Sequence, residues 1–134
     1  MHVGKRGRVL LFFGALDLVI AYSLASPDAE TRRGAYFTWL TAIAPTWIWA
    51  TAWAAVGAVC IWQAFCRHDG GAFAAAIALK VFWAVACIGA WLFGGFERGY
   101  VSAAIWLGLA YLVSVVAGWA EPDSGKGPAW RRQS

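Results

Sequence analysis

The sequence predicts an all-α integral membrane protein in which four transmembrane helices form an antiparallel bundle. The first observation is the composition: of 134 residues, 61% are hydrophobic and only 13% are charged, and the mean hydropathy is +0.59. Soluble domains carry about 45–50% apolar and about 25% charged residues. The second observation is that the apolar residues gather in four long runs separated by short links. Lipid is the natural solvent for such a chain, so we expect a transmembrane domain over residues 1–120.

The four apolar runs predict spans over residues 9–25, 45–65, 72–93 and 100–119. Each run is close to the ~20 residues that a helix needs to cross about 30 Å of hydrocarbon. Only a helix satisfies its own backbone within one such segment. The links SPDAETRRG, RHDGG and GGFERG are polar or glycine-rich and short, so consecutive helices must be antiparallel neighbours.

Residues 35–44 leave two alternatives open, because Pro45 interrupts an apolar stretch that begins at Ala35. These residues form either an interfacial helix or the first turns of a long, kinked span. Tyr36, Trp39, Trp47 and Trp49 suit the headgroup level of a membrane, which favours the interfacial helix.

The first run also has features of a cleaved signal peptide. Three basic residues precede it, and residues 23–25 (Ser-Leu-Ala) are a candidate cleavage site. The aspartate at position 17 and the length of the run favour a helix that is retained as an anchor.

The distribution of basic residues predicts that both termini are cytoplasmic. In this orientation seven Lys and Arg side chains lie inside and three lie outside, in agreement with the positive-inside rule. The inner ones are Lys5, Arg6, Arg8, Arg67, Lys126, Arg131 and Arg132, and the outer ones are Arg32, Arg33 and Arg98. Residues 121–134 are polar and contain Pro and Gly, so we expect a disordered cytoplasmic tail.

Two ionisable side chains lie deep within predicted spans, Asp17 and Lys80. Each is about eight residues, or roughly 12 Å, from the cytoplasmic end of its span, so the two reach a similar depth. Charged groups in a membrane usually pair with one another or face water, and we therefore expect an ion pair between the first and third spans. The alternative is that Lys80 extends to the inner interface while Asp17 is protonated.

Small residues at helical spacing predict faces where helices pack closely. Those near the two charges are Gly14, Ala21, Ala76 and Ala84, and the fourth span carries the track Ala110, Ser114 and Gly118, for contacts within the bundle or between copies. Trp53 and Trp83 are expected between helices. Six further tryptophans are expected near the membrane interfaces: Trp39, Trp47, Trp62, Trp91, Trp106 and Trp119.

A weak internal similarity appears at an offset of about 63–67 residues, where Asp17 aligns with Lys80 and Arg33 with Arg98. Two helix pairs with the same orientation would form a parallel repeat. Coincidence in so biased a composition is the alternative.

The sequence carries no catalytic motif and no metal-ligand cluster. Cys60, Cys66 and Cys87 form no CxxC pattern and are expected to pack as small apolar residues, while His2 and His68 lie outside the spans. We therefore expect no enzyme activity, no metal and no cofactor. The basic residues flank apolar spans instead of forming one face, which argues against a nucleic-acid partner.

Three stretches, RVLLFFGALDLVIAYSL, APTWIWATAWAAVGAVC and AIALKVFWAVACIGAWLFGGFERGYVSAAIWL, resemble small four-helix membrane proteins encoded by phages of actinobacteria. The similarity extends to Pro122 and concerns the order of hydropathy and the local sequence. It implies a holin-like protein that oligomerises in the inner membrane of a bacterial host and permeabilises it for lysis, with a functional link to an endolysin. The alternatives are a non-lytic scaffold or accessory protein, which excludes superinfecting phage or anchors a partner, and a small channel or transporter subunit.

Overall fold

The computed structural model describes residues 4–66 and 68–119, and every secondary-structure element in these ranges is a helix. The helices are α1 (Lys5–Ala25), α2 (Ala29–Arg33), α3 (Ala35–Ile43), α4 (Thr46–Gln63), α5 (Gly70–Phe93) and α6 (Gly99–Ala117). The predicted all-α class is confirmed. The predicted tail, residues 121–134, lies outside the described residues.

Three of these helices, α1, α5 and α6, are by themselves long and apolar enough to cross a membrane. The helix α4 meets the same criterion only together with α3, and the two are bent by 87° at their junction. By length and composition, the described residues thus provide three candidate spans, or four when α3 and α4 count as one. These helices indicate a multi-pass membrane protein.

The helix boundaries differ by a few residues from the predicted spans. α1 begins at Lys5 instead of residue 9, and α5 begins at Gly70 instead of residue 72; α4 ends at Gln63 instead of residue 65, and α6 ends at Ala117 instead of residue 119. The apolar pattern marks where hydrocarbon would begin, whereas at α1 backbone hydrogen bonding includes the polar residues Lys5, Arg6 and Arg8, which are good helix formers. Hydropathy therefore does not determine where a helix ends.

The bend between α3 and α4 is made at Ala44 and Pro45, both of which have extended ψ angles of 154° and 145°. Proline disfavours a helical conformation in the residue before it and has no N–H to donate. The indole N–H of Trp49 lies within hydrogen-bonding distance of the Leu40 and Ala44 carbonyl oxygens, at 3.2 and 3.0 Å. The Leu40 carbonyl oxygen also accepts the Ala44 N–H at 3.1 Å, so the indole adds a second donor at the end of α3. These contacts hold α3 across the end of α4.

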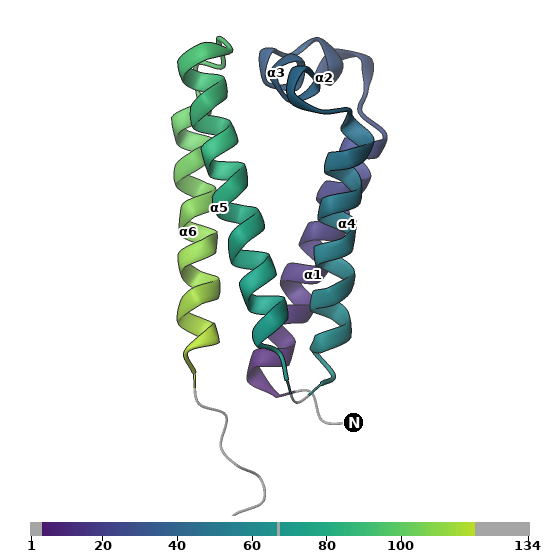
Figure 1. Cartoon of the computed structure of the whole chain (residues 1–134), viewed down its shortest axis with the longest axis vertical. Helices are drawn as coiled ribbons and strands as arrows, with labels where there is room; N and C mark the ends of the chain where they lie inside the picture. The colour runs from purple at the N-terminus through teal and green to yellow at the C-terminus, as the bar shows by residue number, and fades with distance from the viewer. Residues whose placement is uncertain (1–3, 67, 120–134) are drawn as a thin grey trace, which may run out of the picture.

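The long helices form two antiparallel hairpins, α1 with α4 and α5 with α6 (Figure 1). The start of α1, the end of α6 and the α4–α5 connection lie at one end of the molecule, and α2, α3 and the α5–α6 turn lie at the other. The two hairpins converge toward the end that holds the start of α1 (Figure 1).

Within each hairpin the backbones approach closely at glycines. A Cβ atom on Gly14 of α1 would lie 2.7 Å from Cγ1 of Ile61 and 2.9 Å from the carbonyl oxygen of Gly57 in α4. A Cβ atom on Gly99 of α6 would collide with the carbonyl oxygen of Cys87 in α5. Backbone contact at this range is possible only without a side chain, so these glycines determine how tightly each hairpin closes.

Two clusters of buried apolar residues fill the space between the hairpins. One, toward α3, includes Leu24, Trp53 and Trp83, and the other, toward the start of α1, includes Leu10 and Phe73. Asp17 and Lys80 lie between the two clusters along α1 and α5, and both are fully buried. The polar pair therefore has apolar packing on either side.

Candidate functional site

The structure brings Asp17 and Lys80 together across the interface between the hairpins. The ammonium Nζ of Lys80 donates hydrogen bonds to both carboxylate oxygens of Asp17, at 2.9 Å to Oδ1 and 3.2 Å to Oδ2. Both side chains have 0% exposure. A fully enclosed lysine whose ammonium contacts an aspartate is inconsistent with the alternative in which Lys80 extends to the interface.

Two aromatic rings complete the surroundings of the Lys80 ammonium. Its Nζ lies 5.2 Å from the centre of the Phe13 ring and 5.5 Å from the centre of the Trp53 ring. A cation within about 6 Å of an aromatic ring is attracted by the ring's quadrupole. Phe13 and Asp17 belong to α1 and Trp53 belongs to α4, so the whole binding environment of Lys80 comes from the opposite hairpin.

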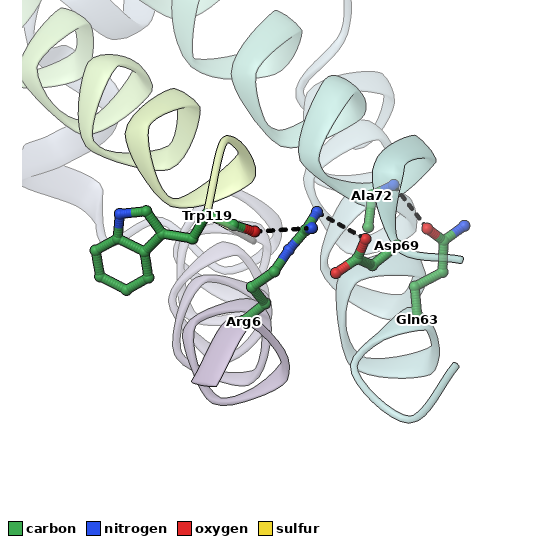
Figure 2. A network of polar contacts seen from close by, with 5 residues as sticks. All are labelled: Arg6, Gln63, Asp69, Ala72 and Trp119. Atoms are coloured by element: carbon green, nitrogen blue, oxygen red, sulfur yellow. Dashed lines mark hydrogen bonds and ion pairs between the residues drawn. The ribbon is translucent and has the colours of Figure 1, made fainter. Parts of the chain in front are cut away.

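A second ion pair joins the same two helices at the end of the molecule where α1 begins (Figure 2). The Arg6 guanidinium of α1 donates to Oδ1 of Asp69 at 2.8 Å and to the backbone carbonyl oxygen of Trp119 at 3.3 Å. Its Cζ also lies 5.0 Å from the centre of the Phe73 ring. Asp69 precedes α5 and Trp119 follows α6, so Arg6 connects α1 to both helices of the other hairpin.

The turn between α4 and α5 is held by a separate polar contact. The backbone N–H of Ala72 donates to Oε1 of the Gln63 side chain at 2.8 Å (Figure 2). This N–H is in the first turn of α5 and has no partner within its own helix. Gln63 thus caps α5 and fixes the distance between α4 and α5 at this end.

The predicted small residues near the charges are buried. Gly14 contacts α4, and Ala21, Ala76 and Ala84 are at most 6% exposed. In α6, Ala110 is buried, but Ser114 and Gly118 are exposed. Among the described residues, contact within the bundle is thus seen for Ala110 and not for Ser114 or Gly118. A contact between copies stays a prediction.

More tryptophans pack between helices than the sequence predicted. Trp53 and Trp83 are buried with ring centres 5.2 Å apart, as expected for residues between helices. Trp106, expected near an interface, packs on Trp53 at 5.2 Å, and Trp49 packs on Trp83 at 5.9 Å. We call Trp49, Trp53, Trp83 and Trp106 the tryptophan cluster; it fills the interface on the α3 side of the Asp17–Lys80 pair.

Sequence reasoning missed the Arg6–Asp69 pair and the role of Gly57. Arg6 and Asp69 are separated by 63 residues, as are Asp17 and Lys80. The offset that relates the deep charges therefore also relates the two charges at the helix ends. That shared spacing was the available signal, and groups at helix ends are usually assumed to be solvated.

Apart from the two ion pairs, the described residues form a groove on the outer surface but no cluster of metal-binding side chains. A groove of about 660 Å³ on the outer side of α1 and α4 is lined by Leu18, Ala58, Ile61, Trp62, Phe65 and Cys66. Within residues 4–66 and 68–119 there is no group of three or more His, Cys, Asp or Glu side chains that could hold a metal ion.

Comparison with known proteins gives no relative for this chain. No protein-family model matches it, and neither the curated proteins nor the solved structures contain a match.

Proposed function

We propose that this is a holin-like protein, which oligomerises in the cytoplasmic membrane of a bacterial host and permeabilises it for lysis. The observation that carries the proposal is the placement of charge. Arg6, Asp17, Asp69 and Lys80 all face the interface between two hairpins whose outer surfaces are largely apolar. In the closed form each of these four charges has a partner, and the molecule presents an apolar surface to lipid.

Separation of the hairpins would convert this closed form into one with a polar face. α1 would then expose Arg6 and Asp17, and α5 would expose Asp69 and Lys80, each on the face that had been buried. Such a face is unfavourable against lipid but stable against water. Several open copies around one aqueous lesion would satisfy both their apolar and their polar surfaces.

The proposed orientation has both termini and the α4–α5 connection in the cytoplasm. It is supported by the excess of basic residues on that side and by the shared end of the molecule at which α1 begins and α6 ends (Figure 1). We also propose that α3 lies in the membrane interface, since it is bent by 87° from α4 and its Thr38 and Thr41 side chains are exposed. The endolysin is the proposed functional partner.

Controlled expression in a bacterial host tests the proposal. We expect abrupt growth arrest, loss of membrane potential measured with a voltage-sensitive dye, and release of a co-expressed endolysin into the medium. Normal growth and potential at a high membrane level of the protein would contradict the proposal.

A static membrane scaffold is the second candidate. It is supported by the contacts of Arg6, which connect the start of α1 to the start of α5 and the end of α6, and by the burial of the Asp17–Lys80 pair. Such contacts hold three helix ends in one fixed arrangement. A scaffold predicts healthy growth at high expression, so the same experiment separates the two functions.

A further inference from the structure

The two ion pairs form one recognition pattern between α1 and α5. Arg6 and Asp17 are eleven residues apart, as are Asp69 and Lys80. Eleven residues are about three helical turns, so each helix presents its two charges on a single face roughly 16 Å apart. The order is basic then acidic on α1 and acidic then basic on α5, so the charges match when the helices run in the same direction.

Aromatic residues repeat the same pattern. Phe13 lies one turn before Asp17 and packs on Lys80, whereas Phe73 lies one turn after Asp69 and packs on Arg6. Each cation is therefore bound by an aspartate and a phenylalanine of the opposite helix. The two faces are complementary in both charge and aromatic packing, and only in this register.

The charged face of α1 and the charged face of α5 are each formed by residues of a single hairpin. The groups that surround Lys80 are Phe13, Asp17 and Trp53, and all three belong to the α1–α4 hairpin. The close backbone contact at Gly14 and Gly57 within that hairpin is made by α1 and α4 alone. The chain passes from one hairpin to the other once, between Gln63 and Gly70.

We propose that the partner of the open form is a second copy of this chain, bound by exchange of hairpins. The α1 face of one copy binds the α5 face of the next, with the same Asp17–Lys80 and Arg6–Asp69 pairs now formed between copies. Reciprocal exchange gives a dimer, and head-to-tail exchange closes a ring. This inference rests on the proposed function, which requires many copies. Exchange pairs the charges between copies while they assemble, and the polar faces meet water only where these pairs separate in turn at the lesion.

Charge reversal distinguishes exchange from pairing within one copy. The full-length variants Asp17→Lys and Lys80→Asp carry different affinity tags and are expressed alone or together. Alone, each variant places two like charges at the buried site. Together, exchange restores two pairs of opposite charge. At one interface the lysine introduced at position 17 meets the aspartate introduced at position 80, and at the other the unchanged Asp17 and Lys80 meet.

The measured quantity is the amount of complex that carries both tags. We expect at least about tenfold more of it when the two different variants are co-expressed than when two differently tagged copies of the same variant are co-expressed. The double variant Asp17→Lys with Lys80→Asp in one chain is the positive control for the reversed pair. If it accumulates while co-expression of the single variants gives no mixed complex, hairpin exchange is wrong.

A second pair of variants covers the case in which the reversed buried pair is not tolerated even in one chain. Arg6→Asp and Asp69→Arg then repeat the test at the partly exposed end. This test is run at low salt, where partly exposed charges are least screened. Preferential recovery of that mixed complex then supports exchange, and equal recovery of mixed and identical copies overturns it.

The outcome is separable from the proposed function, because recovery through both tags does not depend on membrane damage. Mixed complexes in cells that keep their potential would retain hairpin exchange and remove the holin proposal. Growth arrest by the wild-type chain without mixed complexes between the variants would retain the holin proposal and remove hairpin exchange.

Discussion

Contacts within the hairpins and contacts between them are made by different kinds of residue. Inside the α1–α4 hairpin, Gly14 and Gly57 bring two backbones together, whereas between α1 and α5 the space is filled by long charged and aromatic side chains. Packing of small residues stabilises helix pairs in lipid as well as in water, because it relies on van der Waals contact. Ion pairs are stable in lipid only while both partners stay together. The hairpins are therefore the permanent units, and their mutual interface is the part that can change.

The two ion pairs sharpen this difference. Arg6–Asp69 and Lys80–Asp17 have nearly equal N–O distances of 2.8 and 2.9 Å, but the side chains of the first pair are 20% and 18% exposed and those of the second are fully buried. Water and headgroups can take the place of a partner only at the first pair. The two pairs have similar geometry, but their different burial predicts unequal contributions to stability.

The largest expected effect comes from removing one partner of the buried pair. Lys80→Met leaves the Asp17 carboxylate enclosed among apolar side chains, which we expect to destabilise the protein by about 3–5 kcal/mol. Thermal unfolding in detergent micelles, followed by tryptophan fluorescence, measures this loss. The double variant Asp17→Leu with Lys80→Met should recover most of it, because no charge remains without a partner at this site. If the double variant is as unstable as the sum of the two single variants, the pair does not act as a unit.

The second largest loss of stability is expected from a change inside the α1–α4 hairpin. Gly14→Ala places a methyl group 2.7 Å from Cγ1 of Ile61 and 2.9 Å from the carbonyl oxygen of Gly57, so α1 and α4 must move apart. We expect a loss of about 1–3 kcal/mol in the same unfolding measurement. Gly108→Ala is the matched control, because nothing lies within 4 Å of a Cβ at that position, and its stability should be unchanged or slightly higher. Equal behaviour of the two variants would show that close backbone contact does not hold the hairpin.

A smaller effect is expected at the partly exposed pair. Arg6→Gln removes the charge that contacts Asp69 but leaves both partners accessible to solvent, so we expect a loss of about 0–1 kcal/mol. The loss should shrink when salt is raised, since exposed pairs are screened. Unfolding curves at low and high salt test this expectation. A loss as large as that of Lys80→Met would mean that the contacts at the helix ends, and not the buried pair, hold the hairpins together.

The smallest effect is expected on the outer side of α6. Ser114→Leu adds an apolar side chain to an exposed position that contacts no other helix in the described structure, so the stability of a single copy should be unchanged. Size-exclusion chromatography in mild detergent gives the complementary measurement. Altered self-association with unchanged unfolding would assign the exposed part of the track, Ser114 and Gly118, to contacts between copies.

Sequence reasoning was successful where one physical constraint dominates. Twenty apolar residues in lipid must be helical, so the long helices were predictable, and an unpaired charge at depth is so unfavourable that Asp17 and Lys80 could be matched by depth alone. The bend at Pro45 left two alternatives open, because proline permits both a kink and a break. Trp49, whose indole N–H contacts the last carbonyls of α3, supports the break, and this contact depends on three-dimensional placement.

Other features were not predictable because their signals are common. Alanine and glycine are so frequent that small-residue spacing marks several faces of α6, and only the structure distinguishes buried Ala110 from exposed Ser114. Gly57 was overlooked for the same reason. Arg6 and Asp69 lie at helix ends, where most charges are solvated, and nothing in either residue alone indicates a partner 63 positions away.

The equal spacing of the two ion pairs also constrains how this gene can vary. One residue inserted between Arg6 and Asp17 would rotate these side chains by about 100° relative to each other, and the pairs could no longer form on one face. A matching insertion between Asp69 and Lys80 would not restore both pairs, because it would turn the α5 charge toward the opposite side of the interface. The exposed positions within residues 7–16 and 70–79 should therefore tolerate substitution far better than a change of length.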